Sequence, residues 1–314
     1  LIDDAEKKIF SVTKARKAGE FKSIASVMKS AQEQIEKLAK NQNEITGLAT
    51  GFYDLDKLTS GLHENELIIV AARPAMGKTA FALNLAVNAA TKSDKAVALF
   101  NLEMSAEQLA MRMIAAAGGI EMNKVRTGRL EHNDWKKVNE AMSELSETNL
   151  YIEDNAGMTI SEIRAKCRRL ATSDKGLGLI VIDYLQLISG SSKNEGNRVQ
   201  EVSEISRSLK TMAMELKVPV VALAQLSRSV ELRENKRPIM SDLRESGSIE
   251  QDADIVMFLY RDDYYNKAAA EQTDTSITEL IIGKHRNGGT GTIELLFERS
   301  MSNFRNYIKK NEEN

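Results

Sequence analysis

The sequence has almost no cysteine. Cys167 is the single one among 314 residues, so no internal disulfide can form. This excludes a disulfide-stapled secreted fold and is typical of a reducing, cytoplasmic compartment. Cys167 lies in the helical-looking run EIRAKCRRL, where we expect it to pack in the interior rather than to act as a nucleophile. The sequence also lacks any apolar run near the ~18 residues that suggest a membrane span, and no signal peptide is visible.

A strong charge of one sign is absent as well. The 43 Lys and Arg residues are balanced by 45 Asp and Glu residues, so the formal net charge is -2. The chain as a whole therefore has no attraction to nucleic acid, and any contact with DNA or RNA must come from local clusters of Lys and Arg. What is present is an ordinary globular composition, with 42% hydrophobic and 28% charged residues.

The first 45 residues differ from the rest, because they are rich in Lys, Glu, Gln and Ala and contain one turn glycine, Gly19. Apolar residues step by three and four on both sides of Gly19, which predicts two amphipathic helices. The stripes are Ile2, Ala5, Ile9 and Val12, then Ile24, Val27, Met28, Ala31, Ile35 and Leu38. The first helix packs either on its own domain or on a neighbouring subunit, and we favour the second possibility. We therefore divide the chain into a helical arm, 1–45, and a globular domain, 46–314.

The globular domain alternates between two patterns. Its short apolar, β-rich runs are ELIIVAA, KAVALFN, NLYIED, LGLIVIDYL, VPVVALAQ, ADIVMFLY, TELIIGK and TIELLFE. The first six are mostly separated by helical patterns at 79–91, 105–117, 134–147, 160–172 and 198–216. This alternation predicts an α/β fold with a mainly parallel central sheet. The last two runs, joined by HRNGGTG, predict a hairpin at the sheet edge.

The stretch AARPAMGKTA, residues 71–80, is close to the phosphate-loop pattern G-x-x-x-x-G-K-[ST]. Its first glycine is replaced by Ala72, but a predicted strand precedes the loop and a predicted helix follows it, as a phosphate loop requires. Backbone N–H groups of the loop and of the helix N-terminus would face the phosphates. The residues that we expect to bind nucleotide are Ala75, Gly77, Lys78, Thr79 and Ala80.

A phosphate loop requires partners, and three polar residues at strand ends are candidates. Asp183 ends LIVID, where it would hold Mg²⁺ or would be a turn aspartate. Glu103 follows VALFN as a candidate general base, or as a charge at a helix N-terminus that Ser105 caps. Gln225 ends VVALAQ, where ligands bind in open α/β sheets, as a γ-phosphate sensor or as a surface residue.

These elements, in this order, resemble the RecA-like ATPases. Longer segments resemble the bacterial replicative DNA helicases of the DnaB type over about residues 46–310. The segments are ARPAMGKTAFALN, LEMSAEQLAMRM, IRAKCRRL, LIVIDYLQLISG, EVSEISRSLKTMAMELKVPVVALAQLSRSVE, KRPIMSDLRESGSIEQDADIVMFLYRDDYYNK and IIGKHRNGGTGTIELLF. The Ala-Arg-Pro start of the phosphate loop is the usual form in this family.

The resemblance implies a homohexameric ring around single-stranded DNA, with ATP and Mg²⁺ between neighbouring subunits and movement from 5′ to 3′. It implies that Lys78 contacts the β- and γ-phosphates and that Thr79 and Asp183 hold Mg²⁺. It further implies that Glu103 is the general base and that Gln225 senses the γ-phosphate.

The segment KHR carries Lys284 and Arg286, which by resemblance reach the next subunit's site as a trans finger; the alternative is a solvated hairpin pair. The residue between them is His285 instead of the family's usual Gln, and Gly289 stands where Pro is common, so we expect a hairpin of altered stiffness.

In SDLRESGSIEQ, the resemblance makes Arg244, Glu245 and Gly247 contacts to the DNA backbone; the alternative is a surface turn. A glycine allows close backbone approach to a phosphate, and an arginine adds a positive charge. Primase and a helicase loader are partners by resemblance. We expect the family's N-terminal helical domain to be absent from this chain, and residues 1–45 resemble its linker.

Two other hypotheses share the phosphate loop. One is a different RecA-like ATPase, such as a recombinase or a signalling ATPase, and the other is a scaffold that binds nucleotide without turnover. The Lys-x-Arg hairpin and the segment DLRESGSIEQDAD favour the helicase over another RecA-like ATPase. The presence of both Glu103 and Lys78 argues against a scaffold, which would need no general base.

Overall fold

A computed structural model of the protein describes residues 21, 23–40, 45–190, 197–266 and 273–308. The chain forms two compact units, 1–46 and 47–314, which we describe separately. In the first unit, α2 (Ile24–Lys40) confirms the second predicted arm helix. Its apolar residues Ile24, Met28 and Ile35 are exposed. The predicted helix around residues 2–12 lies outside the described residues.

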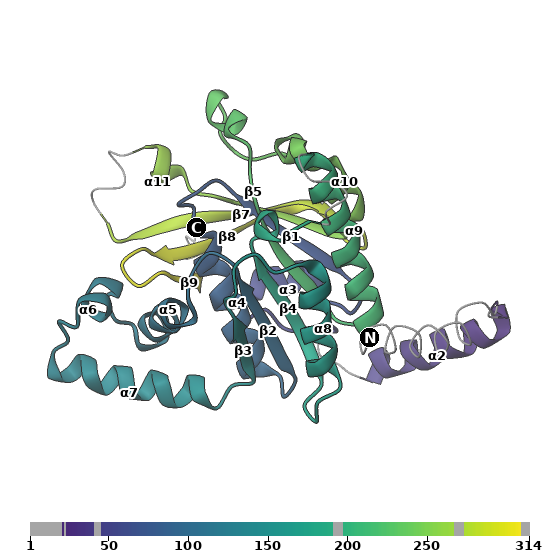
Figure 1. The fold of residues 1–314 in the computed structure, drawn as a ribbon, viewed down its shortest axis with the longest axis horizontal. Helices are drawn as coiled ribbons and strands as arrows, with labels where there is room; N and C mark the ends of the chain where they lie inside the picture. The colour runs from purple at the N-terminus through teal and green to yellow at the C-terminus, as the bar shows by residue number, and fades with distance from the viewer. Residues whose placement is uncertain (1–20, 22, 41–44, 191–196, 267–272, 309–314) are drawn as a thin grey trace, which may run out of the picture. The chain divides into compact units, whose positions relative to one another are not determined.

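The second unit is built on a nine-stranded sheet with the order β3-β2-β4-β5-β1-β6-β7-β8-β9 (Figure 1). The strands from β3 to β6 in this order are parallel, and β7, β8 and β9 continue the sheet in antiparallel fashion. The bounds are β1 Leu67–Ala72, β2 Ala96–Asn101, β3 Leu150–Glu153, β4 Leu177–Asp183, β5 Val220–Gln225, β6 Ile255–Tyr260, β7 Thr275–His285, β8 Gly291–Glu298 and β9 Asn303–Asn306.

Helices link the parallel strands, and polar caps mark where several of them begin. Ser105 and Thr159 accept backbone hydrogen bonds in capping boxes that open α5 and α8, and Asn197 caps α9. The helices are α3 Tyr53–Thr59, α4 Lys78–Lys92, α5 Ala106–Gly118, α6 Met122–Thr127, α7 His132–Ser146, α8 Ile160–Ala171, α9 Arg198–Leu216, α10 Gly247–Asp252 and α11 Asp262–Tyr265. The 3₁₀ helices are η1 Leu185–Leu187, η3 Arg228–Leu232 and η4 Met240–Ser246.

The sheet is buried on both faces, which is why its strands read as continuous apolar runs. On β1, Ile68 and Val70 face the layer of α3, α4 and α5, while Leu67 and Ile69 face the layer of α8, α9 and α10. Cys167 is fully buried in the second layer, and burial raises the pKa of its thiol to about 12. This confirms the packing role that we predicted for it.

The predicted α/β fold with a mainly parallel sheet is confirmed, as are all eight predicted strands and the five helical patterns between them. The predicted hairpin of β7 and β8 is present, but its expected place at the sheet edge was wrong, because β9 pairs with β8 and forms the edge. Within the described residues, we find no helix whose length and apolar character would let it cross a bilayer.

Candidate active site

The loop between β1 and α4 has the backbone of a phosphate cradle. Ala75 and Gly77 have positive φ angles of 65° and 92°, and Gly77 immediately precedes α4. A Cβ atom at Gly77 would lie 3.0 Å from the Phe304 ring. No side chain of the described residues caps α4, so its first N–H groups are free to meet an anion.

Two buried arginines hold this loop in place. Arg73, which is 8% exposed, donates from Nη1 to the carbonyl of Leu226 (2.7 Å) and from Nε to Glu231 (2.9 Å). Arg261 donates from Nη1 to the carbonyl of Ala75 (3.3 Å). The loop is therefore connected on one side to the segment after β5 and on the other to the end of β6.

Thr79, at the start of α4, and Asp183, at the end of β4, are in direct contact next to the phosphate loop. The Thr79 hydroxyl donates to Oδ2 of Asp183 (2.6 Å), and Asn101 Nδ2 donates to the same oxygen (3.2 Å). Asp183 is 1% exposed, and its Oδ1 has no hydrogen-bond partner among the described residues. Burial raises the pKa of Asp183, although Thr79 and the charge of Lys78 oppose that shift.

Lys78 completes this cluster at the first position of α4. Its Nζ lies 4.5 Å from the centroid of the Tyr184 ring. Burial lowers the pKa of Lys78, and the nearby charges of Asp183 and Glu103 oppose the shift. The ammonium group therefore lies near two carboxylates in a poorly hydrated place.

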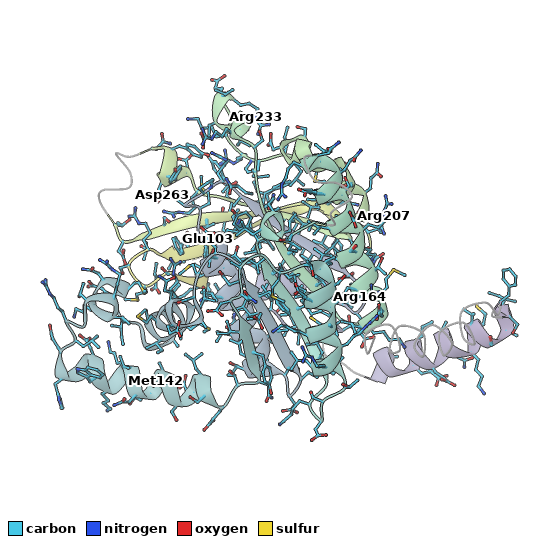
Figure 2. All side chains as sticks on the ribbon, in the orientation of Figure 1. Glu103, Met142, Arg164, Arg207, Arg233 and Asp263 are labelled. Atoms are coloured by element: carbon cyan, nitrogen blue, oxygen red, sulfur yellow. The ribbon has the colours of Figure 1, made fainter. Side chains whose placement is uncertain are left out.

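Glu103 follows the carboxyl end of β2, where its side chain is exposed over the middle of the domain (Figure 2). Its backbone N–H donates to Oδ1 of Asn101 (3.1 Å), and Ser105 caps α5 two residues later. The proposed cap at Ser105 is therefore present, and Glu103 lies outside the helix that Ser105 opens.

Gln225 ends β5 beside the phosphate loop, because its register partner on β1 is Ala72. Its side chain is exposed, and its backbone N–H and C=O are both bonded by the Gln186 side chain at 3.4 Å. The structure thus brings together Gly77, Lys78, Thr79, Glu103, Asp183 and Gln225 at the carboxyl edge of the parallel strands.

Lys284 and Arg286 do not join this group. The Arg286 backbone N–H donates to Asp254 O, and the Asp254 backbone N–H donates to Leu67 O at the start of β1. The phosphate loop follows Ala72 at the other end of this six-residue strand, which at roughly 3.3 Å per residue is about 17 Å away.

Lys284 and Arg286 are both hydrogen-bonded within this chain, at the amino edge of the parallel strands. Lys284 Nζ donates to the carbonyls of Glu250 and Ala253 (2.5 and 2.6 Å), and burial lowers its pKa. Arg286 Nη1 donates to Asp254 (3.2 Å). They are therefore not freely solvated hairpin residues in this structure.

The expected DNA loop is partly described. Arg244 and Glu245 fall within η4, and their side chains lie outside the described part of the structure. Gly247 opens α10, and a Cβ there would meet nothing within 4 Å. The bidentate pair of Arg233 and Asp242 (2.8 and 2.9 Å) closes the projecting loop before η4 (Figure 2).

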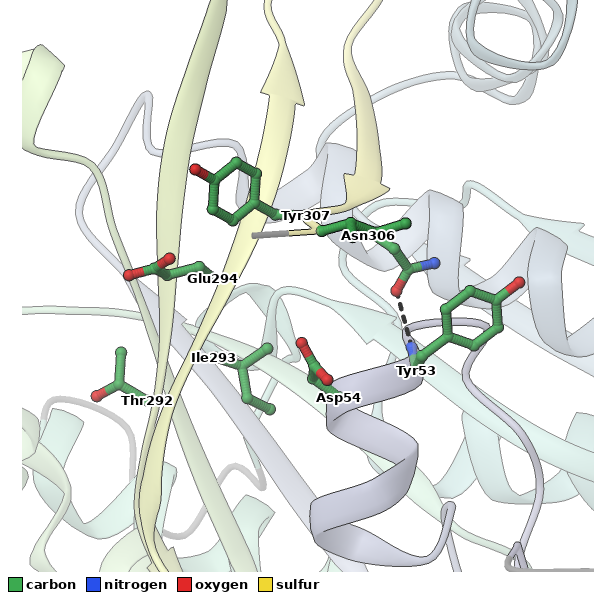
Figure 3. A pocket seen from close by; sticks show the side chains of 8 residues that line it. Tyr53, Asp54, Thr292, Ile293, Glu294, Asn306 and Tyr307 are labelled. Atoms are coloured by element: carbon green, nitrogen blue, oxygen red, sulfur yellow. Dashed lines mark hydrogen bonds between the residues drawn. The ribbon is translucent and has the colours of Figure 1, made fainter. Parts of the chain in front are cut away.

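A hollow of about 490 Å³ lies elsewhere, between the start of α3 and strands β8 and β9 (Figure 3). There the Tyr53 N–H donates to Oδ1 of Asn306 (2.8 Å). The hollow contains no residue of the phosphate loop, and the carboxyl groups of Asp54 and Glu294 line it. We therefore do not assign the nucleotide to it.

Sequence reasoning missed three residues of the site: Asn101, Arg73 and Tyr184. Asn101 is a buried amide at the end of an apolar strand, and this contrast with its neighbours is a signal that could have found it. Tyr184 follows Asp183 and Arg73 follows Ala72, but their partners are distant in sequence: Lys78 on α4 for Tyr184, and Leu226 and Glu231 after β5 for Arg73.

The fold and the site define a RecA-like P-loop nucleotide-binding domain. Residues 47–306 match the family model of the DnaB-like helicase C-terminal domain. The replicative DNA helicase DnaB of Geobacillus stearothermophilus is 55% identical over 313 residues, which are 100% of this chain and 68% of that protein. The chain therefore belongs to the DnaB-like helicase family.

Solved structures agree with this assignment. One solved ATPase domain is 43% identical and covers 92% of this chain and 100% of its own, with a TM-score of 0.85. A DnaB-like replicative helicase, described with its interactions with primase, is 41% identical with a TM-score of 0.82, covering 96% of this chain and 72% of its own.

Proposed function

We propose that this chain is the motor of a replicative DNA helicase, which hydrolyses ATP between the subunits of a homohexameric ring and moves on single-stranded DNA. Family membership and the strand-edge cluster around Lys78 support this proposal. We expect this motor to work in the cytoplasm, to move from 5′ to 3′, and to have primase and a helicase loader as partners. The solved relative described with primase favours the first of these partners.

The cluster fits a magnesium nucleotide. In the described residues there is no group of three or more His, Cys, Asp or Glu side chains that could hold a metal alone. Mg²⁺ usually keeps waters and substrate phosphates as ligands, so Thr79 and Asp183 with its unpartnered Oδ1 suffice on the protein side. Bound there, Mg²⁺ would neutralise charge on the phosphates.

Each remaining residue has a separate chemical role in the proposal. Lys78 binds the β- and γ-phosphates, while the backbone from Ala75 to Ala80 cradles them. Glu103 accepts the proton of the attacking water, because its exposed carboxylate lies near Lys78 and outside the α5 cap. Gln225 contacts the γ-phosphate from the neighbouring strand and relays its loss to the loop after β5.

The single observation that carries the ring is the separation of the two cations from the phosphate loop. Lys284 and Arg286 lie at the amino edge of the parallel strands, away from the phosphate loop of their own domain, and this separation supports a role at the nucleotide of a neighbouring subunit. A cation that reaches the γ-phosphate stabilises the charge of the transition state. DNA would bind Arg244, Glu245 and Gly247 through its backbone, with Glu245 contributing its main chain or bracing Arg244.

The test is ATP turnover measured with and without unstructured single-stranded DNA, at protein concentrations above and below assembly. We expect DNA to stimulate turnover, and only where oligomers form. Turnover that is independent of concentration and insensitive to DNA would mean that the site is complete within one subunit, and it would remove Lys284, Arg286 and the Arg244 loop from the proposal.

A further inference from the structure

Asp254 is a buried carboxylate at the start of β6 whose two oxygens have different partners. The residue is 4% exposed. Its Oδ2 accepts hydrogen bonds from the backbone N–H of Leu67 (2.8 Å) and from Nζ of Lys210 on α9 (2.6 Å). Its Oδ1 accepts from Nη1 of Arg286 (3.2 Å), the one donor to that oxygen among the described residues.

Arg286 is bound to Asp254 in a way that allows release. Its side chain is 49% exposed, whereas that of Lys210 is 21% exposed. Besides Asp254, the guanidinium donates from Nη2 to the carbonyl of Gln251 (2.9 Å), at the end of α10. Because water reaches the guanidinium, another anion can compete for it from the solvent side.

We propose that Asp254 is a positioning residue, which holds the Arg286 guanidinium at the amino edge of the sheet and releases it to the γ-phosphate of the neighbouring subunit. Lys210 stays behind as the counter-charge. This inference rests on the proposed function, since it takes Arg286 to act on the neighbour's nucleotide.

The unequal partners make this transfer physically reasonable. A buried carboxylate that loses its only cation is strongly destabilised, because an uncompensated charge remains in the interior. Asp254 avoids this penalty, since Lys210 and the Leu67 N–H both remain on Oδ2 when Arg286 leaves Oδ1. The hydrogen bond from the Arg286 backbone N–H to the Asp254 carbonyl (2.8 Å) does not involve the guanidinium, so it holds the Arg286 backbone in place when the side chain moves.

The alternative is that Asp254 only fastens β1 to β6. Asp254→Asn separates the two roles, because the amide oxygen can still accept from Leu67 and Lys210. The amide NH₂ then faces Arg286, and no hydrogen bond can form between them, because the amide NH₂ and the guanidinium are both donors. The strand bonds made by the backbone of Asp254 are unchanged by this substitution.

In the DNA-stimulated assay, we expect Asp254→Asn to lower kcat by about 10- to 100-fold, with nucleotide affinity preserved. The matched control is Glu215→Gln, because Glu215 on α9 is also paired with two cations, Arg164 and Arg168, but these lie on α8 and are not part of the finger. This control should keep its turnover, and thermal unfolding should show both variants folded.

Mixed assemblies decide whether the loss acts in trans. Asp254→Asn and Arg286→Ala subunits are each mixed in equal amounts with Lys78→Ala subunits, which have an intact finger but no working site. In each mixture, the nucleotide site is intact only in the Asp254→Asn or Arg286→Ala subunits, and the unaltered finger comes only from Lys78→Ala neighbours. About half of these sites should have such a neighbour, so the rate per intact site should recover to about half of the wild-type value. Recovery with Arg286→Ala but not with Asp254→Asn would overturn the role of Asp254 alone. Recovery with neither would sink the trans finger, and this inference with it.

Discussion

At the scale of single residues, Asn101 arranges the two carboxylates of the site. Its Nδ2 donates to Oδ2 of Asp183, and its Oδ1 accepts from the backbone N–H groups of Glu103 (3.1 Å) and Met104 (2.7 Å). One buried amide therefore fixes both the proposed metal ligand and the start of the segment that carries the proposed base. Moving the Asp183 carboxylate or the backbone at Glu103 would break a hydrogen bond of Asn101.

Glu103→Gln should bind ATP as tightly as the wild type but turn it over about 10²- to 10⁴-fold more slowly, because the amide cannot accept the proton of the water. Turnover and equilibrium binding of a fluorescent nucleotide would be measured on the same preparation. Glu107→Gln is the matched control, since Glu107 is exposed in the first turn of α5, four residues further on. Retained turnover in Glu103→Gln would remove Glu103 as the base.

Asp183→Asn should make the nucleotide-free protein more stable at neutral pH. Burial raises the folded-state pKa of Asp183, so the carboxylate form is a penalty to folding that is present above that pKa. The penalty disappears below about pH 4, where the carboxyl group is protonated in both the folded and the unfolded state. Urea unfolding at several pH values should show the gain of the variant shrink as the pH falls, and a constant gain would contradict this account.

At the scale of elements, the phosphate loop depends on backbone that only glycine adopts easily. Gly77→Ala should cost about 1–3 kcal/mol of stability through its positive φ and should also weaken nucleotide binding, since the added Cβ meets the Phe304 ring at 3.0 Å. Gly119→Ala is the control, because Gly119 has a φ of 59° but a Cβ there meets nothing within 4 Å. Denaturant unfolding and nucleotide titration of both variants would test this, and equal nucleotide affinities would refute it.

The strands and helices that cross the core were predictable because burial on both faces requires a long apolar run or a 3.6-residue stripe in the sequence. β9 was not, because it has four residues and Phe304 is its one buried apolar side chain. The short polar helices α6 and α11 bury no residue and leave no stripe. A local sequence pattern therefore predicts a helix or strand only where that element buries several apolar side chains in the core.

The candidate site was predictable where a residue type stands out at a strand end, as Asp183 and Glu103 do. It was not predictable where the partner is distant in sequence. Arg73 and Leu226 are joined across 153 positions, and Asp254 and Arg286 across 32. No local spacing encodes such contacts, because sheet order sets them.

At the scale of the whole molecule, the net charge of -2 means that the proposed DNA binding would depend on local contacts rather than on an overall field. The proposed ring supplies these contacts by repeating one loop around a single strand. Binding to phosphates would then be sequence-tolerant and strongly dependent on salt.

Arg244→Ala should accordingly weaken single-stranded DNA binding to a similar degree for every base composition, because phosphate contacts carry no sequence information. Removing one phosphate contact should reduce the slope of log K against log salt by about 0.7 for a single strand, and this reduction is repeated for every subunit of the ring that engages the DNA. Fluorescence anisotropy with oligonucleotides of different composition, measured over a salt series, would give both quantities. Arg305→Ala is the control, since Arg305 is a half-exposed arginine paired with Glu298 on the edge strand. Weakening confined to one base composition, or an unchanged salt slope, would exclude Arg244 as a contact to the DNA backbone.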